Sequence, residues 1–462
     1  MYVKVRVLSF CACSLSAAFV SVCMVASLVF IPVSSASAAI TDKATLESRR
    51  QVIFEQILRD PANLDLSFEY ASLSSQVGDY EGAITAMERM LIFAPGLPRI
   101  QLELGVLYYR LGSFAIAQNY LEQAVSGSNV PDVVRSRVAA YLDRIRNAQK
   151  RDKFSGSVLA GIRYQSNANS GPSSANVNLN GIGFTLNDNS VRKDDVNAFV
   201  AVTFHYDHDL QRQGDLFEAD VLFYGAKYLD VTNLDTVVTE LTLGPSFNLQ
   251  RYNIDNTQLG LYGIGNFVGL DDKLYFTTLG FGARISHHTE GGSRVRAKTE
   301  FREKWYNNTS QRPTAKNRDG TRLSAEVAAS SPITTKVLAH GIFRVERENV
   351  DADFFSYYQV GGEFGVTTTL TSPFTGEGTF KNVMFFDVTG GYRHTGYDEA
   401  DPAINANNKQ KSNELFARAT LTIPVADNFT IVPQVEYRDN SSNYDLYDFN
   451  GWTAYIALGK KF

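Results

Sequence analysis

The stretch RVRAKTEFREKW, residues 294–305, alternates two kinds of side chain. One set is Arg294, Arg296, Lys298, Glu300, Arg302 and Lys304, and the other is Val295, Ala297, Thr299, Phe301, Glu303 and Trp305. A period of two is typical of a β-strand, because successive side chains point to opposite faces of the sheet. The pattern therefore predicts a strand with one charged face and one mainly uncharged face.

The same period recurs from residue 154 to the end of the chain. It predicts 14 strands, at about 155–165, 195–209, 215–229, 236–251, 257–268, 274–288, 292–307, 320–331, 335–348, 356–370, 382–397, 412–426, 428–440 and 451–462. The number is even, and each segment is long enough to cross a bilayer when tilted, as in bacterial outer-membrane barrels. An aromatic last residue, Phe462, is also usual for such barrels.

The links between these segments alternate between short and long. This alternation predicts that the first strand begins and the last strand ends on the same side of the membrane, the periplasmic side. The short links are 210–214, 252–256, 289–291, 332–334 and 427. The long links, on the opposite side, are 166–194, 308–319, 398–411 and 441–450. One exception is 371–381, a longer link on the side of the short ones. The weakest seam is expected where the first strand meets the last, because Gly156, Gly161 and Gly459 should loosen its packing.

The charged faces are too rich, and the aromatic residues too many, for a soluble barrel with an apolar interior, so we place the charges in the lumen. The candidate lumen residues are Arg294, Arg296, Lys298, Glu300, Arg302, Arg344, Glu346, Glu436 and Arg438. They have two interpretations. They line a wet channel that conducts or contacts a client, or they pair, for example Arg302 with Glu346 and Arg344 with Glu300, and fill the lumen.

In residues 40–150, apolar side chains recur at three and four positions, which indicates helices. Matching residues at 71/105, 78/112, 80/114, 83/117, 87/121 and 90/124 repeat at 34 residues, which resembles the tetratricopeptide repeat. We expect flanking helices at 43–58 and from Pro131, and a polar link at 147–153. The repeat positions predict a client groove lined by Phe68, Ser72, Ser75, Gln76, Leu102, Val106, Tyr109 and Arg110.

Residues 1–38 have the pattern of a signal peptide: Lys4 and Arg6 precede an apolar run, and Ser34 to Ala38 supply small residues for cleavage. An uncleaved anchor is the alternative. Cys11, Cys13 and Cys23 all lie in this segment, so a cleaved chain has no thiol for a disulfide or a metal. It would carry 42 basic and 49 acidic residues, which disfavours nucleic-acid binding.

Other polar clusters carry weaker signals. His205 and His208 should face opposite sides of a strand, and the adjacent His287 and His288 should diverge, so we expect neither a metal nor another cofactor. The pairs Asp194-Asp195 and Asp271-Asp272 are expected in solvated loops. The sequence lacks a recognisable Ser/His/Asp spacing, so we do not expect an enzyme.

The predicted order of a helical repeat domain and a 14-stranded barrel, together with two local runs, resembles the surface lipoprotein assembly modulators, the Slam family. The runs are residues 130–135 with Tyr141-Leu142, and the first strand's end with the residues after it, 161–169 (GIRYQSNAN). The resemblance covers nearly the whole mature chain. It implies a periplasmic tetratricopeptide domain followed by a 14-stranded outer-membrane barrel, which together move a client, often a lipoprotein, across the outer membrane.

The sequence therefore predicts an α + β chain with three parts: a signal peptide at 1–38, a periplasmic helical domain at 39–153 and an outer-membrane barrel at 154–462. The expected partners are an exported protein or lipoprotein client, outer-membrane lipid and the barrel assembly machinery. An exopolysaccharide export porin and a passive diffusion porin remain the alternatives.

Overall fold

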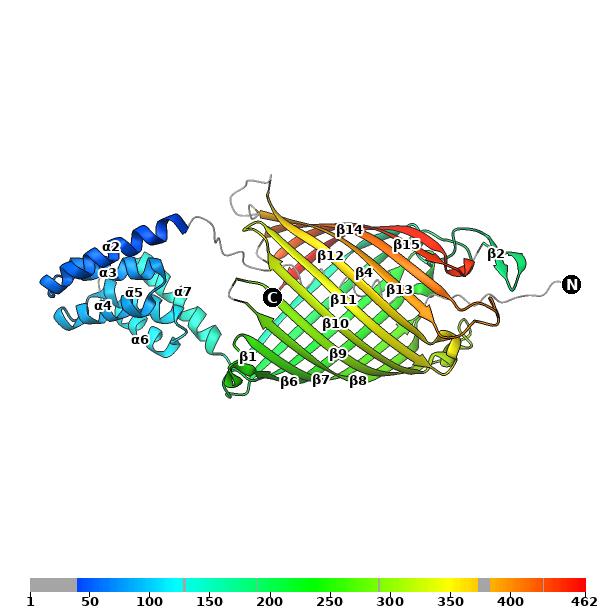
Figure 1. Ribbon diagram of the computed structural model, residues 1–462, viewed down its shortest axis with the longest axis horizontal. Helices are drawn as coiled ribbons and strands as arrows, with labels where there is room; N and C mark the ends of the chain where they lie inside the picture. The colour runs from blue at the N-terminus through cyan, green and yellow to red at the C-terminus, as the bar shows by residue number, and fades with distance from the viewer. Residues whose placement is uncertain (1–39, 128–129, 189, 290, 373–382, 427) are drawn as a thin grey trace. The chain divides into compact units, whose positions relative to one another are not determined.

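A computed structural model describes residues 40–127, 130–188, 190–289, 291–372, 383–426 and 428–462. The signal-peptide prediction falls outside these residues. The chain divides between Arg151 and Asp152 into a helical body and a body of strands. Figure 1 shows the helices in blue and cyan and the barrel strands running from green to red.

The helical body has six helices in the described part of the chain. They are α2 (Ile40–Arg59), α3 (Leu64–Val77), α4 (Tyr80–Phe93), α5 (Pro98–Arg110), α6 (Phe114–Ala124) and α7 (Asp132–Gln149). Gly78 (φ 91°) and Gly112 (φ 73°), 34 residues apart, take the left-handed conformation in the turns that follow α3 and α5. None of the helices in the described ranges has the length and apolarity needed to cross a membrane.

The small residues of the repeat pattern lie in the core between paired helices. Ala71, Ala83 and Ala117 are fully buried. A Cβ on Gly105 would lie 2.6 Å from Cγ of Leu121, so glycine is required for α5 to approach α6. The predicted polar link at 147–153 is wrong at both ends, because α7 continues to Gln149 and β1 begins at Asp152. Only Lys150 and Arg151 lie between the two elements.

The second body is a closed antiparallel barrel of 14 strands, as the alternation predicted. Its strands are β1 (Asp152–Gln165), β4 (Asp195–Asp209), β5 (Leu216–Tyr228), β6 (Thr236–Asn248), β7 (Thr257–Leu270), β8 (Lys273–His288), β9 (Arg294–Tyr306), β10 (Gly320–Pro332), β11 (Val337–Val350), β12 (Tyr357–Thr371), β13 (Val383–Tyr397), β14 (Lys411–Ala426), β15 (Phe429–Ser442) and β16 (Phe449–Lys461). Each strand pairs with its chain neighbour, and β1 pairs with β16 to close the sheet.

Both ends of the barrel sequence lie at one end of the barrel, the terminal end, where the Gly156 and Phe462 backbones exchange hydrogen bonds of 2.9 and 3.1 Å. The opposite, loop end carries 166–194, 307–319 and 398–410. Its connections are not all long, because Asp271 and Asp272 alone join β7 to β8 in a turn where both have φ 55°.

A hairpin inside the 166–194 loop was not predicted. It consists of β2 (Asn176–Leu179) and β3 (Ile182–Thr185) and appears beside the loop end in Figure 1. The Asn178 amide donates to Asp445 at 2.8 Å, and the Asn180 amide donates to the Ile404 carbonyl at 2.8 Å. The hairpin is thereby tied to the last two loops of the barrel.

The seam between β1 and β16 is close-packed, which corrects the expectation that its glycines loosen it. A Cβ on Gly161 would lie 2.3 Å from the Ile456 carbonyl oxygen and 2.7 Å from the Ala457 Cβ. A Cβ on Gly156 would lie 2.6 Å from the Phe462 ring. The glycines are needed because neighbouring atoms occupy the space that a side chain would take.

We expect Gly161→Ala to lower the free energy of unfolding of the barrel by about 1–3 kcal/mol, since the added methyl group cannot fit without moving β16. Gly265→Ala in β7 is the matched control, because its added Cβ would meet only Leu279 Cδ2 at 4.0 Å. Denaturant titrations followed by tryptophan fluorescence report on the barrel, since Trp305 and Trp452 lie in β9 and β16. Equal effects of the two substitutions would contradict a tight seam.

In the helical body, burial and then the hydrogen bond to Glu88 raise the pKa of Tyr108 to about 12. Its hydroxyl donates to Glu88 Oε1 at 2.6 Å. Because folding favours the neutral phenol, its contribution to stability is complete below the ordinary tyrosine pKa of about 10 and is lost as the pH rises through about 12. We expect helical circular dichroism of the full chain to fall in this window, and to fall less steeply in Tyr108→Phe. Identical pH profiles would contradict this assignment.

Candidate functional site: the charged interior of the barrel

The structure places all nine candidate lumen residues on the inner face of the barrel wall. They occupy even-numbered positions of β9, β11 and β15, and the odd-numbered neighbours Val295, Phe301 and Trp305 are 42, 36 and 38 % exposed on the outside. On β16, Trp452, Ile456 and Leu458 are likewise exposed outward, as is Phe462 directly after the strand. The wall is therefore apolar and aromatic outside and charged inside.

Arg302 is the centre of the first inner network. Its guanidinium donates to Glu240 Oε2 at 2.6 Å and to Glu300 Oε2 at 2.9 Å. The hydroxyl of Tyr262 donates to the other oxygen of Glu300 at 2.9 Å. One arginine thus holds two carboxylates from β6 and β9, with only 15 % of its own side chain exposed.

A second network joins β9, β10, β11 and β12. Lys304 Nζ lies 2.9 Å from Glu348 Oε1, and each of the two side chains is only 7 % exposed. Arg322 contacts Glu348 at 2.9 Å and Glu346 at 3.2 Å. Tyr357 donates to the same two glutamates. These buried charges have direct partners, so their desolvation is compensated.

The two ion pairs predicted from the sequence, Arg302 with Glu346 and Arg344 with Glu300, do not form in the structure. Arg302 binds Glu240 and Glu300 instead of Glu346, and Arg344 donates to Glu326 at 3.0 Å instead of to Glu300. The reason is strand register: on β10, between β9 and β11, Arg322 lies opposite both Arg302 and Glu348, and Glu326 lies opposite Arg344. Among the described inward charges, ion pairs join strands no more than three apart. The charges consequently form a lining along the wall and do not bridge the interior.

A third network lies on β13, β14 and β15. Arg418 donates to Glu436 at 2.8 Å, and Arg438 donates to the other oxygen of Glu436 at 3.0 Å. Glu414 lies 3.4 Å from Arg393 and 3.8 Å from Arg438. Of these, only Glu436 and Arg438 were singled out from the sequence. The others are inward residues on strands whose alternation is less regular.

Arg163 is an inward charge that sequence reasoning missed. It is 5 % exposed and donates to the Tyr224 hydroxyl at 2.7 Å and to Asn197 at 3.2 Å, with the Phe199 ring 5.3 Å away. It lies among buried Leu159, Phe199 and Tyr455, so the wall at β1, β4 and β16 is mainly apolar and aromatic. The sequence pattern that could have revealed it is alternation: Arg163 lies between Ile162 and Tyr164, which face outward, so its own side chain must face inward.

The histidines take ordinary structural roles. His205 faces inward and lies 2.6 Å from Asp220, while His208 lies 2.8 Å from Asp152 on the other face. His340 and Asp387, from β11 and β13, lie 2.7 Å apart, and Thr367 and Thr389 both donate to that carboxylate. Within the described ranges there is no group of three side chains able to ligate a metal.

Asp195 corrects the expectation of a solvated carboxylate pair at 194–195. It is 4 % exposed and accepts hydrogen bonds from the backbone amides of Asp230 and Val231 at 3.1 and 2.7 Å. It therefore holds the turn between β5 and β6 in place.

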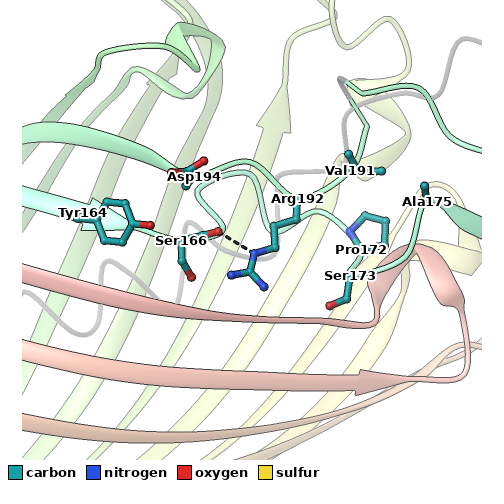
Figure 2. Close-up of a pocket in the computed structure, with 8 residues that line it drawn as sticks. All are labelled: Tyr164, Ser166, Pro172, Ser173, Ala175, Val191, Arg192 and Asp194. Atoms are coloured by element: carbon teal, nitrogen blue, oxygen red, sulfur yellow. Dashed lines mark hydrogen bonds between the residues drawn. The ribbon is translucent and has the colours of Figure 1, made fainter.

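The run after β1 has a structural role. Asn167 donates to the carbonyls of Gly171 and Asn450, and Ser166 accepts from the Trp452 amide at 2.8 Å. These contacts tie the long first loop to β16 across the seam. Figure 2 shows the open pocket of about 390 Å³ beside them, where Arg192 Nε donates to the Ser166 carbonyl at 2.8 Å and Tyr164 lies at one edge.

The groove predicted on the helical body is only partly accessible. Leu102 and Val106 are 7 and 4 % exposed and pack with Val138 and Ile145 of α7, so they belong to the core and not to an open surface. Tyr109 lies against the Tyr141 ring at 5.4 Å. The other predicted groove residues, Phe68, Ser72, Ser75, Gln76 and Arg110, are half-buried or exposed. The Arg99 guanidinium lies 4.7 Å from the centre of the Phe68 ring, and the Arg110 guanidinium lies 5.7 Å from the centre of the Tyr80 ring. The Gln76 side chain donates a hydrogen bond to the Ser72 hydroxyl.

No known protein-family model matches the chain, and no curated protein matches its sequence. Among solved structures, the chain is similar to the Yersinia enterocolitica type III secretion chaperone SycD in complex with a peptide of the translocator YopD: 15 % identity, 24 % of this chain and 86 % of the other, TM-score 0.22. It is also similar to the Thermus thermophilus TPR protein TTC0263: 20 % identity, 23 % and 55 % coverage, TM-score 0.22. At these TM-scores the likeness carries no argument.

We expect Arg302→Gln to lower the free energy of unfolding of the barrel by about 3–5 kcal/mol, because it leaves Glu240 and Glu300 without their shared partner. Arg296→Gln on the same strand is the control. Arg296 has no ion pair among the described residues, so its loss should change stability by less than about 0.5 kcal/mol. Tryptophan-monitored denaturation checks both. A small effect for Arg302→Gln would show that the network does not stabilise the wall.

Proposed function

We propose that the chain is an outer-membrane protein, with its helical body in the periplasm, that translocates or assembles an exported protein client. The observation that carries the proposal is the closed 14-strand barrel with an apolar outer face and a charged inner face, in one chain with a body of helical repeats. A lipid bilayer accommodates such an outer face, because closure pairs the backbone groups of every strand.

The two bodies suggest a division of labour. In this proposal the accessible face of the helices around Phe68, Ser72, Gln76 and Arg110 holds an extended client segment, and the barrel gives the client passage. A surface lipoprotein or small secreted protein is the proposed client class. The inner ion pairs support passage in one respect: they run along the wall and leave the interior uncrossed by salt bridges among the described residues.

The experiment compares surface-exposed proteins in the parent strain, a strain lacking the gene and the strain restored with the wild-type gene. Surface biotinylation and protease accessibility measure exposure. We expect at least one exported protein to lose most of its exposure, roughly tenfold, in the deletion strain and to regain it on restoration. Its total amount in the cell separates failed translocation from failed synthesis.

An unchanged set of surface proteins would contradict the proposal. Loss of secreted polysaccharide from the deletion strain would instead favour an exopolysaccharide exporter. Steady single-channel conductance of the purified chain, with no change in surface proteins or polysaccharide, would favour a diffusion porin.

A further inference from the structure

Two inward arginines at the terminal end of β9 differ from the other arginines of the inner wall. Arg294 and Arg296 are exposed to solvent and make no ion pair or hydrogen bond within the part of the chain that the structure describes. Seven other inward arginines each contact a carboxylate: Arg284, Arg302, Arg322, Arg344, Arg393, Arg418 and Arg438. These two guanidiniums thus keep their hydrogen-bond donors available.

The neighbouring strands supply no carboxylate opposite either arginine. On the β8 side, His288 pairs with Arg294 and Ser286 with Arg296. On the β10 side, Ser330 pairs with Arg294 and Ala328 with Arg296. The first carboxylate further in is Glu326, opposite Lys298, and Arg344 already donates to it. The two arginines therefore face only a histidine, two serines and an alanine on the neighbouring strands, and they form a positively charged patch with no acid directly opposite.

This arrangement does not contribute to folding in the way that the paired arginines do. Like charges on one face of a strand repel, and neither arginine lies within ion-pair distance of a described carboxylate. The attraction between Arg296 and the buried Glu326 acts only at longer range. The spacing of the two arginines is informative: residues two apart on a strand lie about 7 Å apart on the same face. Alternate side chains of an extended peptide have the same spacing, so carboxylates two residues apart can each meet one guanidinium with charge-assisted hydrogen bonds.

We propose that Arg294 and Arg296 bind an extended client segment that carries acidic side chains at alternate positions. The inference rests on the proposed function, because the terminal end of the barrel, where β9 begins in Figure 1, then faces the periplasm and receives the client. The peptide spacing favours a polypeptide over an acidic polysaccharide, which becomes an outcome of the test.

The test uses the full chain in detergent and two fluorescent ten-residue peptides, one alternating Glu with Thr and one alternating Gln with Thr. We expect the wild-type chain to bind the Glu peptide roughly tenfold more tightly than the Gln peptide, as measured by fluorescence anisotropy. The preference should vanish in R294Q/R296Q. It should shrink at high salt, because screening weakens exposed ion pairs.

The control variant R347Q/K227Q removes the same charge at the loop end, where Arg347 is bound by Asp398 and Lys227 by Asp235. It should keep the preference. Unchanged denaturation midpoints show that R294Q/R296Q is folded. A missing Glu preference in the wild type, or an equal loss in the control, overturns the proposal. Tighter binding of polygalacturonate than of the Glu peptide overturns it in favour of a polysaccharide ligand.

The peptide experiment and the surface-protein experiment fail independently. An arginine-dependent Glu preference in a chain whose deletion leaves surface proteins unchanged would retain the binding site and reject the proposed function. The reverse result would retain the function and reject this site.

Discussion

Hydrogen bonding between β1 and β16 is the constraint on which the rest of the barrel depends. Without that pairing, two strand edges would expose unpaired backbone groups, and the wall could not enclose a separate interior. Glycine at 156 and 161 makes the pairing possible, because the Phe462 ring and the backbone of Ile456 occupy the space beside these residues. The last residue of the chain is thus part of the closure, and the Ser166–Asn167 contacts reinforce it from the loop end.

Closure then decides the state of the inner charges. An arginine such as Arg302, 15 % exposed, is stable inside the wall only because Glu240 of β6 and Glu300 of its own strand both bind it. The same strand carries two arginines without such partners, Arg294 at its first position and Arg296 two residues later. The arginines at the start of β9 are therefore available to a ligand, whereas Arg302, further along the same strand, stabilises the wall.

The inner wall is also uneven around its circumference. Charged networks occupy β5 through β15, whereas Leu159, Phe199 and Tyr455 make the inner surface at β1, β4 and β16 apolar and aromatic. A single buried arginine, Arg163, interrupts that surface, held by a tyrosine hydroxyl and an asparagine. A passing polypeptide would meet polar partners on one side and apolar ones on the other, which suits the mixed side chains of a protein better than those of a uniform polymer.

The sequence by itself determined the helical repeats, the number of barrel strands and the face to which each side chain of β9 points. These follow from periods of 34 and two, which are local properties of the chain. Only the tertiary structure decided which charges pair, that Leu102 and Val106 lie in the core, and that the seam glycines are packed. Those outcomes depend on strand register and on α7 covering α5, which bring together residues far apart in the chain, and no local pattern encodes such distances.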